Sequence, residues 1–179
     1  LHQCADAIMR LRAAYLWGNE QYESIHFNFT NGFNASYSKW MQGNRISVKN
    51  NKVSWYKSTT PSNTYQTFWK YLEMVFSYAG TLSLSKEMQS KSIDEMEIGD
   101  VFIRGGSPGH AIIVVDMAEN QNGDVKFMLA QSYMPAQELQ ILCNPNGENG
   151  TIWYDINSNG TLSTPEWTFE NSELKQFAD

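Results

Sequence analysis

Three side chains have the chemical types that nucleophilic attack on a carbonyl group requires: a thiol, an imidazole and an amide. Cys4 lies in the first turns of an expected helix, His110 opens an expected strand, and Gln131 lies near the end of the next strand. A helix N-terminus and a neighbouring imidazolium both favour a thiolate. An imidazole base also needs a polar group that fixes its tautomer. We therefore predict Cys4 as nucleophile, His110 as general base and then acid, and Gln131 as the orienting group.

Strand pairing brings two of these side chains together. If residues 119–122 form the hairpin loop between the two strands, Ala118 lies opposite Gly123 and His110 lies opposite Gln131. Directly opposed residues have Cβ atoms about 5 Å apart on one face of a sheet, whereas a slip of one residue turns them to opposite faces. The glycine-rich turn at residues 105–109 is expected to leave room for a substrate backbone beside His110.

Each of these residues also fits an unreactive role. Cys4 shares the helical spacing of the apolar residues that follow it, which is the pattern of a buried cysteine. His110 fits a hydrogen-bonded strand end. Gln131 fits an ordinary polar residue at a strand end, and Gln137 and Gln140 compete for any role given to it.

The composition indicates one globular chain and excludes several partners. The 179 residues are 41% apolar and 18% charged, and we expect a single domain over residues 1–179. A net charge of −6, with 13 dispersed Lys and Arg, offers no basic face for nucleic acid. The longest apolar run, residues 111–115, is far too short to cross a bilayer. Two cysteines and three scattered histidines do not make a structural zinc site, so we predict no metal and no organic cofactor.

The expected elements place helices before strands. Apolar spacing predicts helices over residues 4–17, 62–79 and 84–89, and a short last helix over 171–178. Strands are predicted at 101–104, 110–117, 125–133 and 139–142, and the second of them is apolar on both faces, so it is expected to be central. The order predicts an α+β fold in which an antiparallel sheet packs against the N-terminal helix that carries Cys4.

A long segment separates the first two helices. Residues 19–63 are polar and aromatic and are expected to form loops and short elements, which often carry recognition. In an enzyme this segment should line the groove that holds Cys4, and in a binding module it should form its own aromatic cleft. The substrate-binding side chains that we predict are Trp40, Arg45 and Tyr133.

Two short stretches resemble a known superfamily. The residues 98–103 (IGDVFI) and 109–114 (GHAIIV) are similar to the signature of NlpC-type papain-like cell-wall cysteine peptidases and amidases. The resemblance implies a papain-like fold whose triad maps to Cys4, His110 and Gln131. It also implies a cysteine hydrolase that acts on an amide bond, with a peptide or cell-wall fragment as its partner.

A second resemblance covers nearly the whole chain. The segments 4–7 (CADA), 108–111 (PGHA), 129–137 (LAQSYMPAQ) and 164–167 (TPEW) resemble a bacterial family, domain of unknown function 4846, whose name implies no activity. Members look like envelope proteins that often carry a lipoprotein-type leader, which implies a periplasmic or lipid-anchored location. Because the chain opens inside a helical pattern with no capping residue, we expect it to be the C-terminal part of a longer envelope protein.

Two other functions remain open at this point. One is a non-catalytic envelope module that binds peptide or glycan through the aromatic region 33–69. The other is a structural domain of a larger lipoprotein. The sequence leaves the oligomeric state open.

Overall fold

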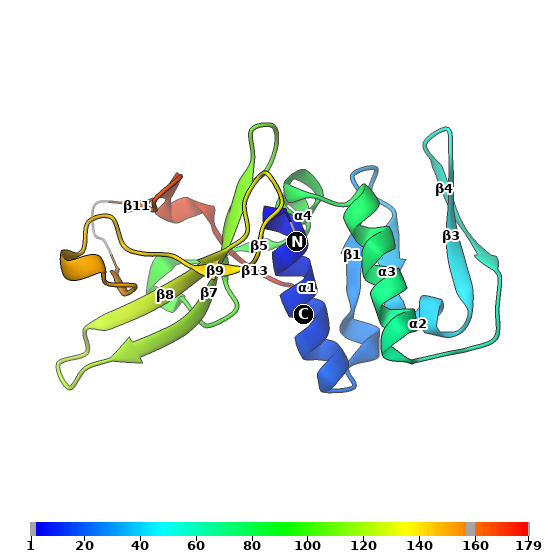
Figure 1. Ribbon diagram of the computed structural model, residues 1–179, viewed down its shortest axis with the longest axis horizontal. Helices are drawn as coiled ribbons and strands as arrows, with labels where there is room; N and C mark the ends of the chain where they lie inside the picture. The colour runs from blue at the N-terminus through cyan, green and yellow to red at the C-terminus, as the bar shows by residue number, and fades with distance from the viewer. Residues whose placement is uncertain (1–2, 157–159, 179) are drawn as a thin grey trace.

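The computed structural model describes residues 3–156 and 160–178 and has a mixed α+β architecture (Figure 1). Within these residues there are four α-helices: α1 (Cys4–Gly18), α2 (Tyr37–Met41), α3 (Tyr65–Tyr78) and α4 (Thr81–Glu87). Helix α3 begins three residues after the predicted start at residue 62, because the hydroxyl of Thr64 caps it, accepting a hydrogen bond from the N–H of Thr67 at 3.3 Å. The three helices predicted in the first half of the chain are therefore present.

A seven-stranded antiparallel sheet forms the other half of the molecule. Its strands are β5 (Gln89–Ser90), β6 (Val101–Arg104), β7 (His110–Glu119), β8 (Val125–Gln131), β9 (Gln140–Ile141), β10 (Tyr154–Asp155) and β13 (Leu174–Gln176). The order is β10-β8-β7-β6-β13-β5, and β9 pairs with the end of β8. Strand β7 is central, as its apolar run predicts.

Three two-stranded hairpins complete the described structure. Strand β1 (His26–Asn28) pairs with β2 (Asn34–Ser36), β3 (Asn44–Lys49) with β4 (Lys52–Lys57), and β11 (Thr161–Ser163) with β12 (Thr168–Glu170). Figure 1 shows the β3–β4 hairpin at the end of the molecule farthest from the large sheet.

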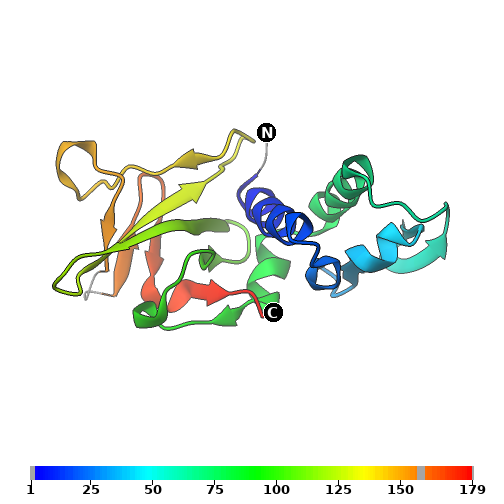
Figure 2. The same ribbon diagram turned by 90° about the horizontal axis from the view of Figure 1, so that it is seen from below.

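The sheet has a buried core on each face. Ala111 and Ile113 of β7 face helix α1, where they join a cluster with Ile8 and Met9. Alternate β7 residues face the other way, and there Ile112 packs in a second cluster with β11 and β12. Figure 2 shows α1 between the sheet and the α2–α3 region. The predicted packing of the sheet on the Cys4 helix is therefore present.

The segment 19–63 is more ordered than the sequence predicts. It forms two hairpins, helix α2 and a short 3₁₀ turn, and its aromatic side chains Phe27, Tyr37 and Trp40 are buried. Strands β1 and β2 are only three residues long, so their alternation is too brief to recognise in the sequence. Strands β3 and β4 have six residues each, and their apolar residues Ile46, Val48, Val53 and Trp55 alternate, so this hairpin had a sequence signal that was missed.

The last element also differs from the prediction. Residues 171–173 form a 3₁₀ turn, and β13 then inserts between β6 and β5, with Leu174 opposite Phe102. Leu174 is fully buried in the core of the sheet. The sheet offers an open edge at β6, so tertiary pairing overrides the local helical spacing in this segment.

Candidate active site

His110 and Gln131 meet, although by a different register from the one predicted. Ala118 pairs with Lys126, three residues beyond the predicted Gly123. A bulge between Val114 and Asp116 then shifts the strand pairing back by one residue. At His110 and Gln131 the pairing therefore differs from the predicted register by two residues. An even displacement keeps both side chains on one face of the sheet. His110 Nε2 lies 2.8 Å from Gln131 Oε1, and both residues are 1% exposed.

A carboxylate fixes the orientation of the Gln131 amide. The amide nitrogen of Gln131 donates to Glu166 Oε2 at 2.8 Å, and an ionised carboxylate can only accept. The amide oxygen therefore faces His110, which must donate from Nε2. In the neutral ring this tautomer leaves Nδ1 as a proton acceptor.

Cys4 is the first residue of α1 and lies against the start of β7. The N-terminus of α1 is closed by Asp6, whose Oδ2 accepts from the backbone N–H of Gln3 at 3.3 Å. The thiol is half-buried, and the backbone N–H groups of Ala5 and Ala111 are close enough to influence its ionisation. Ala111 follows His110 directly, so the first helix places its thiol beside the strand end that carries the imidazole.

One cavity of about 390 Å³ is bordered by both Cys4 and His110. Its other walls are the α3–α4 junction, the glycine-rich turn before β7, residues 133–134 and Trp167. Among the residues that the structure describes, no hydrogen bond joins the thiol to the imidazole. The contact between these two groups therefore stays a prediction.

The resting site favours neutral groups. Burial raises the pKa of the Cys4 thiol, and the N–H groups of Ala5 and Ala111 lower it only in part. Burial also lowers the pKa of His110, and the hydrogen bond to Gln131 and the negative charge of Glu166 offset only part of that effect. This differs from the thiolate expected at a helix N-terminus, because loss of solvation outweighs the helix field here.

The glycine-rich turn packs on the protein itself. A Cβ on Gly109 would lie 2.5 Å from Thr81 Oγ1 and 2.6 Å from the carbonyl oxygen of Gly106. The space beside Gly109 is thus filled by helix α4 and by the turn, rather than left free for a substrate backbone. The glycine allows the turn to approach α4 closely, which brings His110 and the start of α4 to one cavity.

Aromatic rings surround the imidazole. Its centroid is 4.9 Å from that of Tyr133, 5.5 Å from that of Trp167 and 6.0 Å from that of Phe169. Tyr133, which the sequence predicts as a substrate side chain, borders the cavity. Trp167 and Glu166 were missed as site residues, although both lie in the segment 164–167 that carries part of the family resemblance.

Trp40 and Arg45 do not border this cavity. Trp40 is 5% exposed, and its indole N–H donates to the carbonyl of Thr67 at 3.1 Å. The Arg45 guanidinium lies 4.3 Å from the centre of the Trp40 ring and donates to the Trp40 carbonyl at 3.0 Å. No part of segment 19–63 lines the cavity within the described structure, so the expected wall from this segment is not present.

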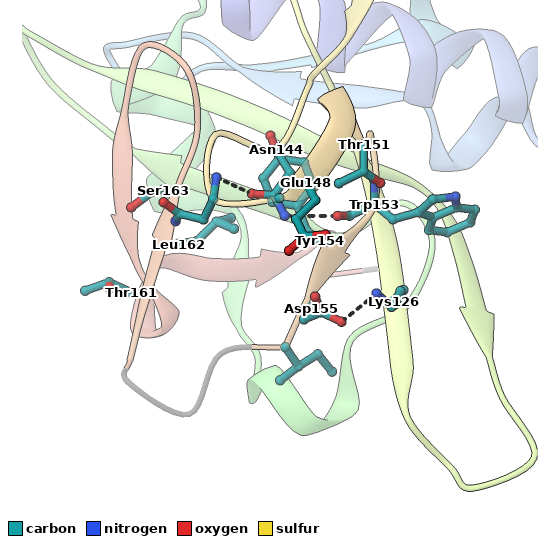
Figure 3. Close-up of a pocket in the computed structure, with 13 residues that line it drawn as sticks. Lys126, Asn144, Glu148, Thr151, Trp153, Tyr154, Asp155, Thr161, Leu162 and Ser163 are labelled. Atoms are coloured by element: carbon teal, nitrogen blue, oxygen red, sulfur yellow. Dashed lines mark hydrogen bonds and ion pairs between the residues drawn. The ribbon is translucent and has the colours of Figure 1, made fainter.

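A larger cavity lies elsewhere, between β8, β10 and the β11–β12 hairpin. It measures about 620 Å³, and Figure 3 shows Lys126 and Asp155 at its edge, joined by an ion pair of 3.1 Å. Its lining contains neither a cysteine nor a histidine. Across residues 3–156 and 160–178, no group of three His, Cys, Asp or Glu side chains could hold a metal ion. The thiol and imidazole therefore mark the smaller cavity as the candidate site.

Comparison with other proteins gives one match. No curated protein and no solved structure matches the chain. In the described part of the chain, none of the helices has the length and apolar character that a membrane span needs. A family model described as domain of unknown function 4846 matches residues 1–176, which is nearly the whole chain. The chain therefore belongs to the family of domain of unknown function 4846.

Proposed function

We propose that the chain is a cysteine hydrolase that cleaves an amide bond, with Cys4, His110 and Gln131 as its catalytic group. The observation that carries the proposal is the 2.8 Å contact between His110 and Gln131, at a cavity that Cys4 also borders. The resemblance of residues 98–114 to NlpC-type papain-like enzymes supports the same assignment and a papain-like fold.

The chemistry follows from the protonation states. In the neutral resting pair, the Cys4 thiol attacks the substrate carbonyl while its proton moves to Nδ1 of His110. The imidazolium then gives that proton to the leaving amine, and water hydrolyses the resulting thioester. The amide oxygen of Gln131 holds the Nε2–H of the ring throughout.

The start of α1 supplies donors for the developing oxyanion. The first four N–H groups of a helix have no partner within the helix, and those of Cys4 and Ala5 lie nearest the sulfur. Such donors stabilise a tetrahedral intermediate when they point at its oxygen.

The substrate that we propose is a cell-wall peptide, and the location is the cell envelope, periplasmic or lipid-anchored. The resemblance to NlpC-type enzymes and the envelope-like members of the family support both. Bordering the cavity, Tyr133 and Trp167 offer apolar surface, and Asp6 offers a carboxyl group whose pKa burial raises.

The test is hydrolysis of purified cell-wall peptides, followed by mass spectrometry of the products. Wild-type protein should release cleaved peptide, and Cys4→Ala should lower the rate by at least about a thousandfold. Cys143→Ala is the matched control, because that thiol is exposed and is not part of the cavity lining. Cleavage that persists in Cys4→Ala would overturn the proposal.

A non-catalytic binding module is the second candidate. A separate cavity of about 280 Å³ lies between Phe29, Val48, Val53 and Tyr78, at the edge of the aromatic region. If this cavity carries the function, peptide or glycan fragments should bind without turnover. Val53→Asp should then abolish binding, whereas Cys4→Ala should leave it unchanged.

A further inference from the structure

We propose that Glu166 is a positioning residue that holds His110 in its Nε2–H tautomer by fixing the side-chain amide of Gln131. The proposal rests on the proposed function, because it explains how the base of that reaction keeps a free nitrogen. Glu166 makes no hydrogen bond to the ring; it acts through the 2.8 Å hydrogen bond from the Gln131 amide nitrogen to Oε2.

The turn between β11 and β12 holds Glu166 in place. Both the N–H and the hydroxyl of Thr164 donate to the carbonyl of Trp167 at 2.8 Å, which closes a short turn around Glu166. Thr164 is buried, and the adjacent Trp167 ring packs on His110. The same turn therefore supplies both the carboxylate for Gln131 and an apolar wall for the imidazole.

The need for this carboxylate follows from the shape of an amide. The oxygen and nitrogen of Gln131 are nearly the same size, so the side chain fits its site in either orientation. With the nitrogen turned toward the ring, Nε2 would have to accept, and the proton would move to Nδ1. In that tautomer Nδ1 already carries a hydrogen, so it has no free lone pair and cannot take the proton of a thiol.

Because Gln131 is buried, its two hydrogen-bond partners determine which way the amide is turned. The residue is 1% exposed, and its side chain is hydrogen-bonded to His110 on one side and to Glu166 on the other. An ionised carboxylate accepts a hydrogen bond from the amide nitrogen and repels the amide oxygen. Because hydrogen bonds to charged groups are the stronger ones, the orientation with oxygen toward His110 is favoured.

The test reads the tautomer directly by ¹⁵N NMR of the imidazole at pH 7.5, in wild type and in Glu166→Ala and Glu166→Gln. The wild-type ring should carry its proton on Nε2. In Glu166→Ala the ratio of Nε2–H to Nδ1–H should fall by about tenfold or more, with a smaller fall in Glu166→Gln, whose amide can accept or donate. Glu138→Ala, an exposed carboxylate outside the cavity lining, is the control and should not change the ratio.

Two outcomes would overturn the proposal. One is a wild-type tautomer ratio in both folded Glu166 variants. The other is a loss of peptide hydrolysis in Glu166→Gln with no change of tautomer, since Glu166 would then act by another route. The spectrum is recorded without substrate, so absence of Cys4-dependent hydrolysis would refute the proposed function and leave this measurement intact.

Discussion

Two parts of the molecule bury polar side chains among aromatic rings: the aromatic half, which holds segment 19–63 and helix α3, and the end of the sheet at His110. The two parts complete their hydrogen bonds differently. In the aromatic half, the Tyr71 hydroxyl donates to the carbonyl of Ala35 at 2.7 Å, and the Trp40 indole donates to that of Thr67. Each side chain ends on a backbone acceptor inside the core. Such closed pairs stabilise a core and leave no polar atom for a ligand.

At the end of the sheet the hydrogen bonds form a chain that leads to a cavity. The chain runs from Glu166 through Gln131 to His110, and the cavity beyond it is also bordered by the thiol of Cys4. Abundant aromatic residues thus mark core in one half, whereas the directed polar chain marks the candidate site in the other.

Replacement of Trp40 should have the largest effect on stability. Trp40→Ala should lower the free energy of unfolding by about 3–5 kcal/mol, because it empties a buried site and removes the bond to Thr67. Urea denaturation measures the loss, and Tyr56→Ala, at a side chain that is 49% exposed, should change it by less than about 0.5 kcal/mol. Unchanged stability together with lost peptide or glycan binding would instead make Trp40 a recognition residue.

The two thiols should differ in reactivity. Burial raises the pKa of Cys4, so iodoacetamide at pH 7 should modify the exposed Cys143 about tenfold faster. The rate at Cys4 should rise as the pH is raised above the ordinary thiol value of 9.0. Peptide mapping gives the two rates. Faster modification of Cys4 at pH 6–7 would contradict the neutral resting pair and indicate a thiolate–imidazolium pair.

The smallest predicted effect is on the titration of His110. Burial lowers the pKa of His110 below its ordinary 6.5, so the unfolded chain binds this proton first on acidification. The contribution of His110 to the free energy of unfolding is therefore fully present above about pH 6.5. It is lost as the pH falls through the lower pKa of the folded state. Removal of the Glu166 carboxylate should lower the folded pKa of His110 further, because its negative charge raises that pKa in the wild type.

NMR titration of wild type and Glu166→Ala measures that shift. A value for His110 above 6.5 in the wild type would contradict the account, because it would mean that the ring is stabilised as imidazolium. The stability of His110→Asn, measured by urea unfolding between pH 7 and pH 5, should depend less on pH than that of the wild type.

Much of the fold could be predicted because long apolar patterns carry it. Strand β6 has the predicted bounds, and α1 and β7 begin at the predicted residues. Strand β13 could not be predicted, since three residues carry no useful period and their state depends on an open edge elsewhere in the sheet. Strands β1 and β2 of segment 19–63 were missed because they are equally short.

The site was only partly predictable. The His110–Gln131 contact was predicted from a loop assumption that was off by three residues, and the bulge near Val115 restored the common face. A bulge has no clear sequence signal, so this agreement depended on a feature that the sequence does not show. Glu166 comes from a hairpin 35 residues away from Gln131, and such a partner becomes visible only when the turn is placed in space.

The most direct test of the central claim is covalent capture by a cell-wall peptide that ends in a vinyl sulfone, with the modified residue located by mass spectrometry. The electrophile places a reactive carbon where the scissile carbonyl would bind, so the account predicts one label per chain, on Cys4. His110→Ala should slow this labelling by about a hundredfold or more, because the thiol loses its base. Labelling on Cys143, or labelling of Cys4 at an unchanged rate in His110→Ala, would contradict the account.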